Sequence, residues 1–143
     1  MTDQTQTALT RFSQGFSCSQ SVFSAFAAQF GIAEDLALKI ASPFGSGVAR
    51  QGEVCGAVTG ALMVIALKHG TITPEKKEEI YKISQEFIHR FEEKHGSIIC
   101  RKLTGYDIRR PEELEKAREK KVFEKNCPGL VKDAAEIVKL LIK

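Results

Sequence analysis

The residues of this sequence most able to carry out chemistry are its four cysteines, Cys18, Cys55, Cys100 and Cys127. The surrounding sequence places each of them within about the first turn of a predicted helix. A helix N-terminus presents unpaired N–H groups and the positive end of the helix dipole, and both favour a thiolate over a thiol. The pKa of a cysteine in such a place falls from about 8.5 to as low as about 3.5–7.5. If the four helix starts meet, the sequence predicts one thiolate site that attacks disulfides or binds metal.

Capping signals support these helix starts. Ser17 and Gln20 form the pattern of a capping box around Cys18, with Ser17 as the N-cap. Asn126 is a favourable N-cap, and Pro128 suits the first turn of a helix, so the sequence predicts that a helix begins with Cys127 at its first position. Cys55 and Cys100 follow glycine-rich and serine-containing segments that also precede predicted helices.

The spacing of the cysteines excludes several common sites. The sequence contains no Cys-x-x-Cys, which argues against a thioredoxin-type motif, a zinc ribbon and c-type haem attachment. The closely spaced cysteines of ferredoxins are absent as well. A site must therefore be assembled from four separate helices with one sulfur from each. The competing interpretation is that the cysteines are small buried apolar residues without a site.

The most apolar segment of the chain follows Cys55. Residues 54–67 carry no charge, which predicts a helix at about 54–69 that is buried on nearly every side. This segment is shorter than the roughly 20 residues that span a bilayer. Gly56 and Gly60 lie four residues apart on one face and predict close packing against another backbone. The partner is either a helix of the same chain or a second copy in a homodimer.

Helical periodicity with capping, glycine and proline signals accounts for the rest of the chain, and no stretch shows the two-residue alternation of a strand. The fold class is therefore all-α, a compact bundle of about five to seven helices around the central apolar helix at about 54–69. A length of 143 residues suits a single domain, 1–143, with its own core. Beyond the central helix, the predicted segments are 3–14, 18–30, 34–42, 73–95, 98–103, 111–124 and 127–141.

The glycine-rich loop and the histidines carry weaker signals. Residues 44–52 lack the third glycine of a dinucleotide fingerprint and the Lys-Ser/Thr of a P-loop, so we interpret them as a flexible approach to Cys55. His69 and His95 each precede a helix-ending glycine, where a partial positive charge suits the helix dipole. His89 has apolar neighbours and fits either a structural or a functional role.

Composition excludes several classes of partner. A net charge of +3 is too small to indicate nucleic-acid binding, and the basic residues of 109–125 alternate with acidic ones as on a solvated helix. The first twelve residues are polar, without the apolar region of a signal peptide, and no transmembrane segment is predicted. We therefore expect a cytoplasmic protein without membrane insertion. In that compartment four cysteines favour thiol chemistry or metal binding over structural disulfides.

The pattern around Cys55 resembles a known family. Cys55 stands in the motif Cys-Gly-Ala-x-x-Gly with Gly52 before it, one cysteine upstream and two downstream. This arrangement resembles the redox-active protein family named after its cysteine pattern, C_GCAxxG_C_C, although the motif order here differs from the letters of that name. The likeness covers nearly the whole chain, with further landmarks at 17–20, 44–47 and 126–128. The resemblance implies that all four cysteines form the site and that the site is redox-active.

The favoured function is a redox protein whose four cysteines, Cys18, Cys55, Cys100 and Cys127, form one site for thiol/disulfide chemistry or for metal or iron–sulfur binding. The sequence does not decide whether the cofactor is an iron–sulfur cluster or zinc. It does not identify the redox partner either. In the thiol version, Cys55 is expected to attack because its glycine neighbours leave the sulfur accessible, and another cysteine resolves. The alternatives are a structural zinc site, for which four thiolates are equally suited, and a helical interaction module without turnover.

Overall fold

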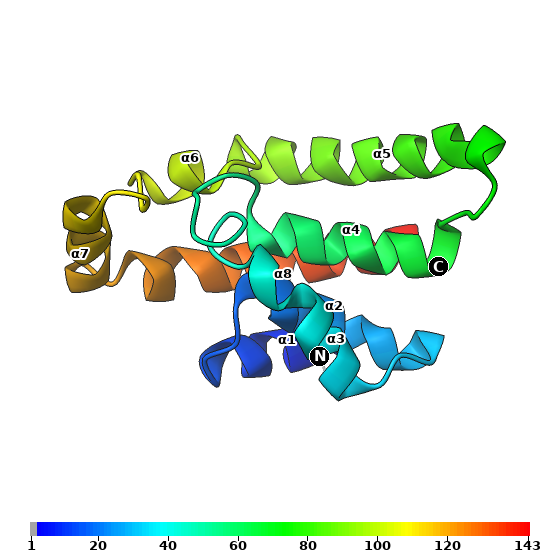
Figure 1. Ribbon diagram of the computed structural model, residues 1–143, viewed down its shortest axis with the longest axis horizontal. Helices are drawn as coiled ribbons and strands as arrows, with labels where there is room; N and C mark the ends of the chain where they lie inside the picture. The colour runs from blue at the N-terminus through cyan, green and yellow to red at the C-terminus, as the bar shows by residue number, and fades with distance from the viewer. Residues whose placement is uncertain (1–2) are drawn as a thin grey trace.

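The computed structural model describes residues 3–143 and confirms the all-α prediction. Eight α-helices and three short 3-10 helices form the described chain, which contains no strand (Figure 1). The α-helices are α1 (Gln4–Ser13), α2 (Cys18–Ala27), α3 (Glu34–Ala41), α4 (Gly56–His69), α5 (Lys77–His95), α6 (Cys100–Thr104), α7 (Pro111–Glu119) and α8 (Val122–Leu141). The 3-10 helices are Ala28–Phe30, Ser42–Phe44 and Pro74–Lys76.

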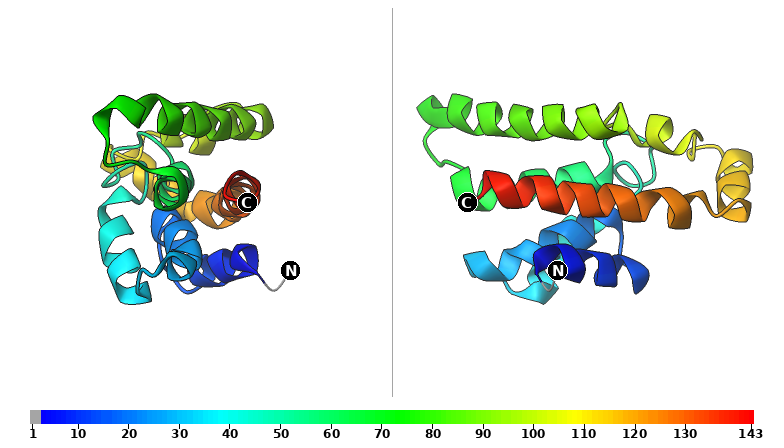
Figure 2. Two further views of the ribbon diagram at one scale, coloured as in Figure 1. Left: turned by 90° about the vertical axis from the view of Figure 1, so that its right-hand side faces the viewer. Right: turned by 180° about the vertical axis from the view of Figure 1, so that it is seen from behind.

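Helix α4 lies at the centre of the bundle, as its uncharged sequence predicts. It packs against α2, α5 and α8, while α1 and α3 lie against the outer sides of α2. Figure 2 shows α5 running back along α4 and α8, and α7 projecting at the end of the molecule, where it connects α6 to α8. The core of α4 includes Val58, Ala61, Val64 and Ile65, which are completely buried. The N-terminal end of α4 therefore lies where the other cysteine-bearing segments meet it.

The two glycines of α4 pack directly against α2. A Cβ atom on Gly60 would lie 2.8 Å from the carbonyl oxygen of Ser19, and one on Gly56 would lie 2.9 Å from the backbone nitrogen of Ser19. Such distances leave no room for any side chain, so the predicted close packing is confirmed. Because the partner is α2 of the same chain, this face of α4 is not available for a homodimer.

The C-terminal third differs from the prediction in two ways. Helix α7 ends at Glu119 and not near residue 124, because Lys121 adopts a left-handed conformation with φ of 54°. Helix α8 then begins at Val122 and continues through Pro128, so the predicted helix start at Cys127 is wrong. Proline in a helix costs about 3 kcal/mol, because it lacks an N–H for the carbonyl four residues earlier. The continuous helix buries an apolar face that includes Val122 and Leu130, and this burial offsets that cost.

The loop before α4 forms a left-handed helical turn. Five consecutive residues, 46–50, have φ between 50° and 71°. Each non-glycine residue in this conformation costs about 1–2 kcal/mol. Backbone hydrogen bonds close the turn, from Ala49 to the carbonyl of Pro43 (2.7 Å) and from Glu53 to that of Gly47 (2.8 Å). The expected flexible approach to Cys55 is therefore a hydrogen-bonded turn of unusual hand.

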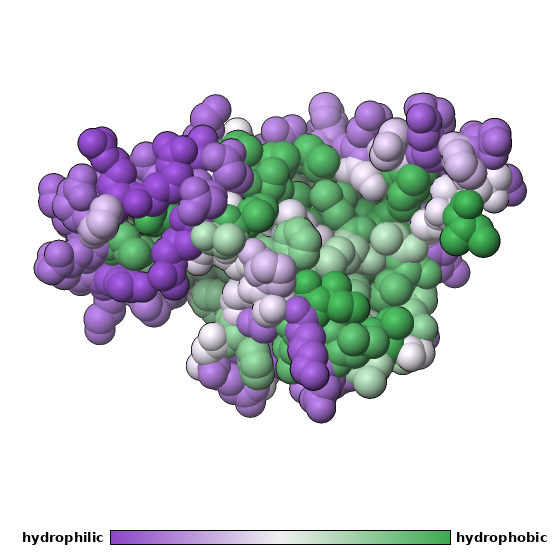
Figure 3. Space-filling model, viewed as in Figure 1, coloured by the Kyte–Doolittle hydropathy of each residue, from purple (hydrophilic) through white to green (hydrophobic). Residues whose placement is uncertain are grey.

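The surface of one face is largely apolar. Figure 3 shows hydrophobic residues gathered over the middle of the molecule, while the end formed by α7 is hydrophilic. Leu36 and Ile40 of α3 are 49% and 44% exposed.

Within residues 3–143 no single helix has the length and apolar character to cross a membrane. One bent pair, Gly56–His69 with Pro74–His95, meets those two criteria together, with a bend of 119°.

Candidate functional site

Cys18 is positioned by the capping box that the sequence predicts. The Ser17 hydroxyl accepts a hydrogen bond from the Gln20 backbone (3.3 Å), and the Gln20 side chain accepts one from the Ser17 backbone (3.1 Å). Cys18 is therefore the first residue of α2. A Cβ atom on Gly56 would lie 3.2 Å from the Cβ atom of Cys18, so the missing side chain at Gly56 lets α2 bring Cys18 against the start of α4.

Cys55 and Cys100 are held together by a short backbone bridge. Val54 and Ile99 form an isolated antiparallel β-bridge. The Cys55 N–H donates to the carbonyl of Ile98 (2.7 Å), and the Cys100 N–H donates to that of Glu53 (2.6 Å). Cys55 is the N-cap of α4 and Cys100 is the first residue of α6, as predicted. A bridge of one residue on each side is too short to produce a strand pattern, so it could not be predicted from the sequence.

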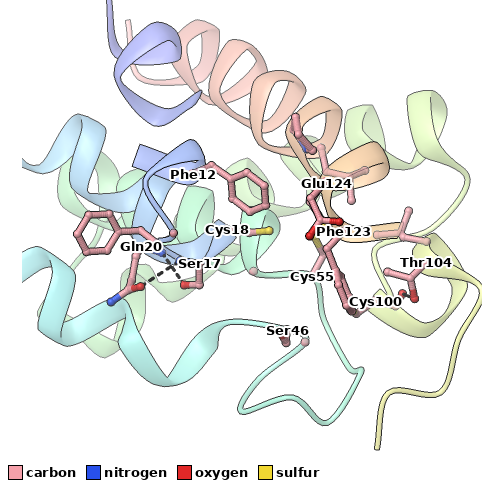
Figure 4. A pocket seen from close by; sticks show the side chains of 18 of the residues that line it. Phe12, Ser17, Cys18, Gln20, Ser46, Cys55, Cys100, Thr104, Phe123 and Glu124 are labelled. Carbon is pink, nitrogen blue, oxygen red and sulfur yellow. Dashed lines mark hydrogen bonds between the residues drawn. The ribbon is translucent and has the colours of Figure 1, made fainter. Parts of the chain in front are cut away.

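Cys127 lies one and a half turns into α8 and completes the group. All four cysteines line one cavity of about 770 Å³, bounded by α1, α2, α6, α8 and the turn before α4. Figure 4 shows the Cys18 sulfur pointing across this cavity, with Phe12, Phe123 and Glu124 around it and the Ser46 turn below. The structure thus brings the four separated cysteines to one place, although only three of them lie at helix starts.

Burial raises the pKa values of Cys55 and Cys100, so the prediction of low pKa values is wrong for these two thiols. Burial raises the pKa of Cys55 to about 12, although the N–H groups of Ala57 and Val58 act in the opposite direction. Burial also raises the pKa of Cys100 to about 11. Cys55 is only 4% exposed, so the expectation that its glycine neighbours leave the sulfur accessible is wrong. The partial charges of a helix end do not compensate for the loss of solvent around these two thiols.

The ionisation of Cys127 depends on the neighbouring Cys18 thiol. Interaction with that thiol lowers the pKa of Cys127, because the Cys18 thiol stabilises the Cys127 thiolate. The same interaction, followed by burial, raises the pKa of Cys18 well above its ordinary value. Glu124 opposes the effect on Cys127, because its negative charge raises the pKa of that thiol. The thiol most readily ionised is therefore Cys127, which lies inside a helix, and not Cys55.

The raised pKa of Cys55 predicts alkaline destabilisation. The unfolded thiol ionises near its ordinary pKa of 9.0, whereas the folded thiol stays protonated up to about 12. Its contribution to stability is complete below pH 9.0 and is lost as the pH rises toward 12, by up to about 4 kcal/mol at about 1.4 kcal/mol per pH unit. Urea unfolding between pH 8 and 11 should show a steeper decline for the wild type than for Cys55→Ala. Parallel curves for the two proteins would contradict this assignment.

The donor atoms do not fit a resident metal or cluster. Among residues 3–143, no three side chains of histidine, cysteine, aspartate or glutamate are grouped closely enough to hold a metal ion. None of the three histidines lines the cavity. His95 contacts Asp133 (2.9 Å), His69 contacts the carbonyl of Leu141 (2.9 Å), and His89 is exposed beside Glu93 (4.0 Å). The predicted ligand set Cys18, Cys55, Cys100 and Cys127 shares a cavity without the geometry of a metal site.

Several cavity residues were missed in the sequence. Arg50 lies on the left-handed turn, and Glu124 and Phe123 lie on α8 one turn before Cys127. Spacings of three and four residues would have placed both on the face of Cys127, had the helix been predicted to continue through Pro128. Phe12 of α1 and Phe16, which follows that helix, add aromatic walls to the cavity.

The comparisons with known proteins agree with this geometry. A family model described as "Putative redox-active protein (C_GCAxxG_C_C)" matches residues 16–141. The matched region contains all four cysteines of the cavity and both glycines of the α4 face. No curated protein and no solved structure matches the chain.

Proposed function

The chain belongs to the C_GCAxxG_C_C family, and from this premise we propose that it is a redox protein in which Cys127 and Cys18 form the reacting thiol pair. The observation that carries the proposal is that both cysteines line one cavity, where interaction with the Cys18 thiol lowers the pKa of Cys127. Thiol–disulfide exchange needs a thiolate to attack and a second thiol within reach to resolve. Cys127 meets the first requirement and Cys18 the second.

The exchange proceeds in two steps. The Cys127 thiolate attacks one sulfur of a substrate disulfide, the substrate S–S bond breaks, and one thiolate leaves and takes the proton of Cys18. The Cys18 thiolate then attacks the Cys127 sulfur of the mixed disulfide, forms a Cys18–Cys127 disulfide and releases the second substrate thiolate. Two electrons pass from the protein to the substrate. An electron donor such as a dithiol returns the pair to its reduced form by the reverse exchange.

In this proposal the neutral thiols of Cys55 and Cys100 do not react and only line the cavity. Their pKa values of about 12 and about 11 keep them protonated near neutral pH, and a thiol is a poor nucleophile. They line the cavity beside the reacting pair and give it a weakly polar wall. Part of the proposal is a cytoplasmic location, where reducing conditions keep all four cysteines as thiols.

Mapping the disulfide tests the pair. The reduced protein is oxidised without oxygen by the neutral bis(2-hydroxyethyl) disulfide. We expect peptide mass spectrometry to identify a disulfide between Cys18 and Cys127. Cys18→Ser and Cys127→Ser should each abolish that bond, and dithiothreitol should reverse it in the wild type. A Cys55–Cys100 bond in place of it would contradict the assignment of the pair. Stoichiometric zinc, or iron with sulfide, on protein purified without oxygen would contradict thiol–disulfide exchange as the function.

A further inference from the structure

The depth of the thiols limits what can reach them. Cys100 and Cys127 are each 7% exposed, and Cys55 is 4% exposed. Cys18 is half-buried, but the attacking Cys127 is too little exposed to meet a disulfide held on the surface of another folded protein. The cavity of about 770 Å³ falls in the range of about 300–1,000 Å³ that holds small organic ligands. The site is therefore shaped for a small molecule.

The walls of the cavity show what kind of molecule fits. Phe12, Phe16 and Phe123 supply an apolar lining. Arg50 and Glu124 supply opposite charges, and within residues 3–143 neither forms an ion pair or a side-chain hydrogen bond. Ser46 and Gly47 also line the cavity, and their backbone N–H groups donate no hydrogen bond within residues 3–143. One side of the cavity thus favours an anion and another favours a cation.

Resting on the proposed exchange reaction, we propose that the substrate is a small disulfide that carries both a carboxylate and an ammonium group, as the disulfides of amino acids and short peptides do. Arg50 and the free N–H groups of the left-handed turn bind the carboxylate. Glu124 binds the ammonium. With both ends held, the S–S bond lies over Cys127 between the aromatic walls.

Because Glu124 lies near Cys127, an ammonium bound to Glu124 would also affect the ionisation of Cys127. Glu124 precedes Cys127 by three residues on α8, and its negative charge raises the pKa of the Cys127 thiol. A bound ammonium neutralises this charge and so favours the thiolate at the moment when a substrate is present. The exchange itself is the one given above, with the amino-acid disulfide as the oxidant and two amino-acid thiols as products. The electron count is unchanged.

Four disulfides of similar size and different charge test the proposal. They are cystine (zwitterionic ends), cystamine (cationic), dithiodiglycolate (anionic) and bis(2-hydroxyethyl) disulfide (neutral). The rate of oxidation of the anaerobic protein is measured with each and divided by the rate of the same disulfide with free 2-mercaptoethanol. We expect the normalised rate for cystine to exceed that for the neutral disulfide by about tenfold, the size of a pair of exposed ionic contacts.

Two charge-removing variants and their controls complete the test. Arg50→Gln should reduce the preference for disulfides with carboxylates, and Glu124→Gln should reduce the preference for those with ammonium groups. Lys39→Gln on α3 and Glu119→Gln at the end of α7 make the same changes in net charge away from the cavity and should leave the preferences intact. Circular dichroism checks that each variant is folded.

The outcomes separate the two proposals. Equal normalised rates for all four disulfides would overturn the zwitterionic substrate and leave thiol–disulfide exchange standing. A preference for the dianion that depends on Arg50 alone would also overturn the zwitterionic substrate. If even the neutral disulfide fails to oxidise Cys18 and Cys127, the reaction proposed for the site is itself wrong.

Discussion

Replacing Cys18 with alanine should slow the alkylation of Cys127 at neutral pH. The substitution removes the thiol whose interaction lowers the pKa of Cys127, while burial and the charge of Glu124 continue to raise it. Each unit of increase in the pKa lowers the thiolate fraction about tenfold when the pH is below the pKa. The rate is measured with iodoacetamide under anaerobic conditions, and labelled Cys127 is quantified by peptide mass spectrometry.

Serine at position 18 is the matched control. Its hydroxyl replaces the thiol as a hydrogen-bond donor but cannot form a disulfide. Cys18→Ser should therefore keep much of the fast alkylation of Cys127 and still lose the reversible oxidation. If Cys18→Ala reacts at Cys127 as fast as the wild type does, the Cys18 thiol does not activate Cys127. Cys127 would then lose its assignment as the attacking residue.

Replacing Gly60 with valine should lower the free energy of unfolding by about 3 kcal/mol or more. Its Cβ atom would lie 2.8 Å from a backbone oxygen of Ser19 and 3.2 Å from the Cβ atom of Val22, so α2 must move away from α4. Overpacking of a close contact costs about 1–3 kcal/mol, and the backbone at this contact has little freedom to yield. Because Cys18 is the first residue of α2, the same movement should slow oxidation of the Cys18–Cys127 pair.

Gly129 provides the control, since it is also inside a helix but has nothing within 4 Å of an added Cβ atom. Gly129→Ala should increase the free energy of unfolding by up to about 1 kcal/mol, the difference in helix propensity between the two residues. Urea unfolding followed by circular dichroism measures both variants. A Gly60→Val protein as stable as the wild type would show that α2 does not pack on α4 as described.

Local signals in the sequence predicted most of the helices and the four cysteines of the site, but not the charged and aromatic residues around them. The capping residues around Cys18 act within four positions of it, so a sequence reveals them. The uncharged run after Cys55 and the spacing of Gly56 and Gly60 likewise indicated a central helix with a close neighbour, although not which neighbour. The predicted helix starts pointed to the four cysteines and the family resemblance supported them, and the match over residues 16–141 confirms the family.

The failures share a cause, which is that burial depends on distant parts of the chain. Asn126 and Pro128 are good residues for a helix start, but the apolar face of α8 is buried only if the helix is continuous. A helix end lowers the pKa of a thiol in water, whereas Cys55 is surrounded by protein and has a raised pKa. The left-handed turn at 46–50 contains one glycine and a β-branched valine, so nothing local indicates it.

The position of the reacting pair along the chain links oxidation to folding. Cys18 lies in the first turn of α2 and Cys127 in the last helix, so roughly 100 residues separate them. A covalent link between them would close most of the polypeptide into a ring and remove a large part of the conformational freedom of the unfolded chain. For a ring of about 100 residues, the chain-entropy model gives about 4–5 kcal/mol of added stability. The oxidised protein would thus be the more resistant to unfolding, and global unfolding would make its disulfide easier to reduce.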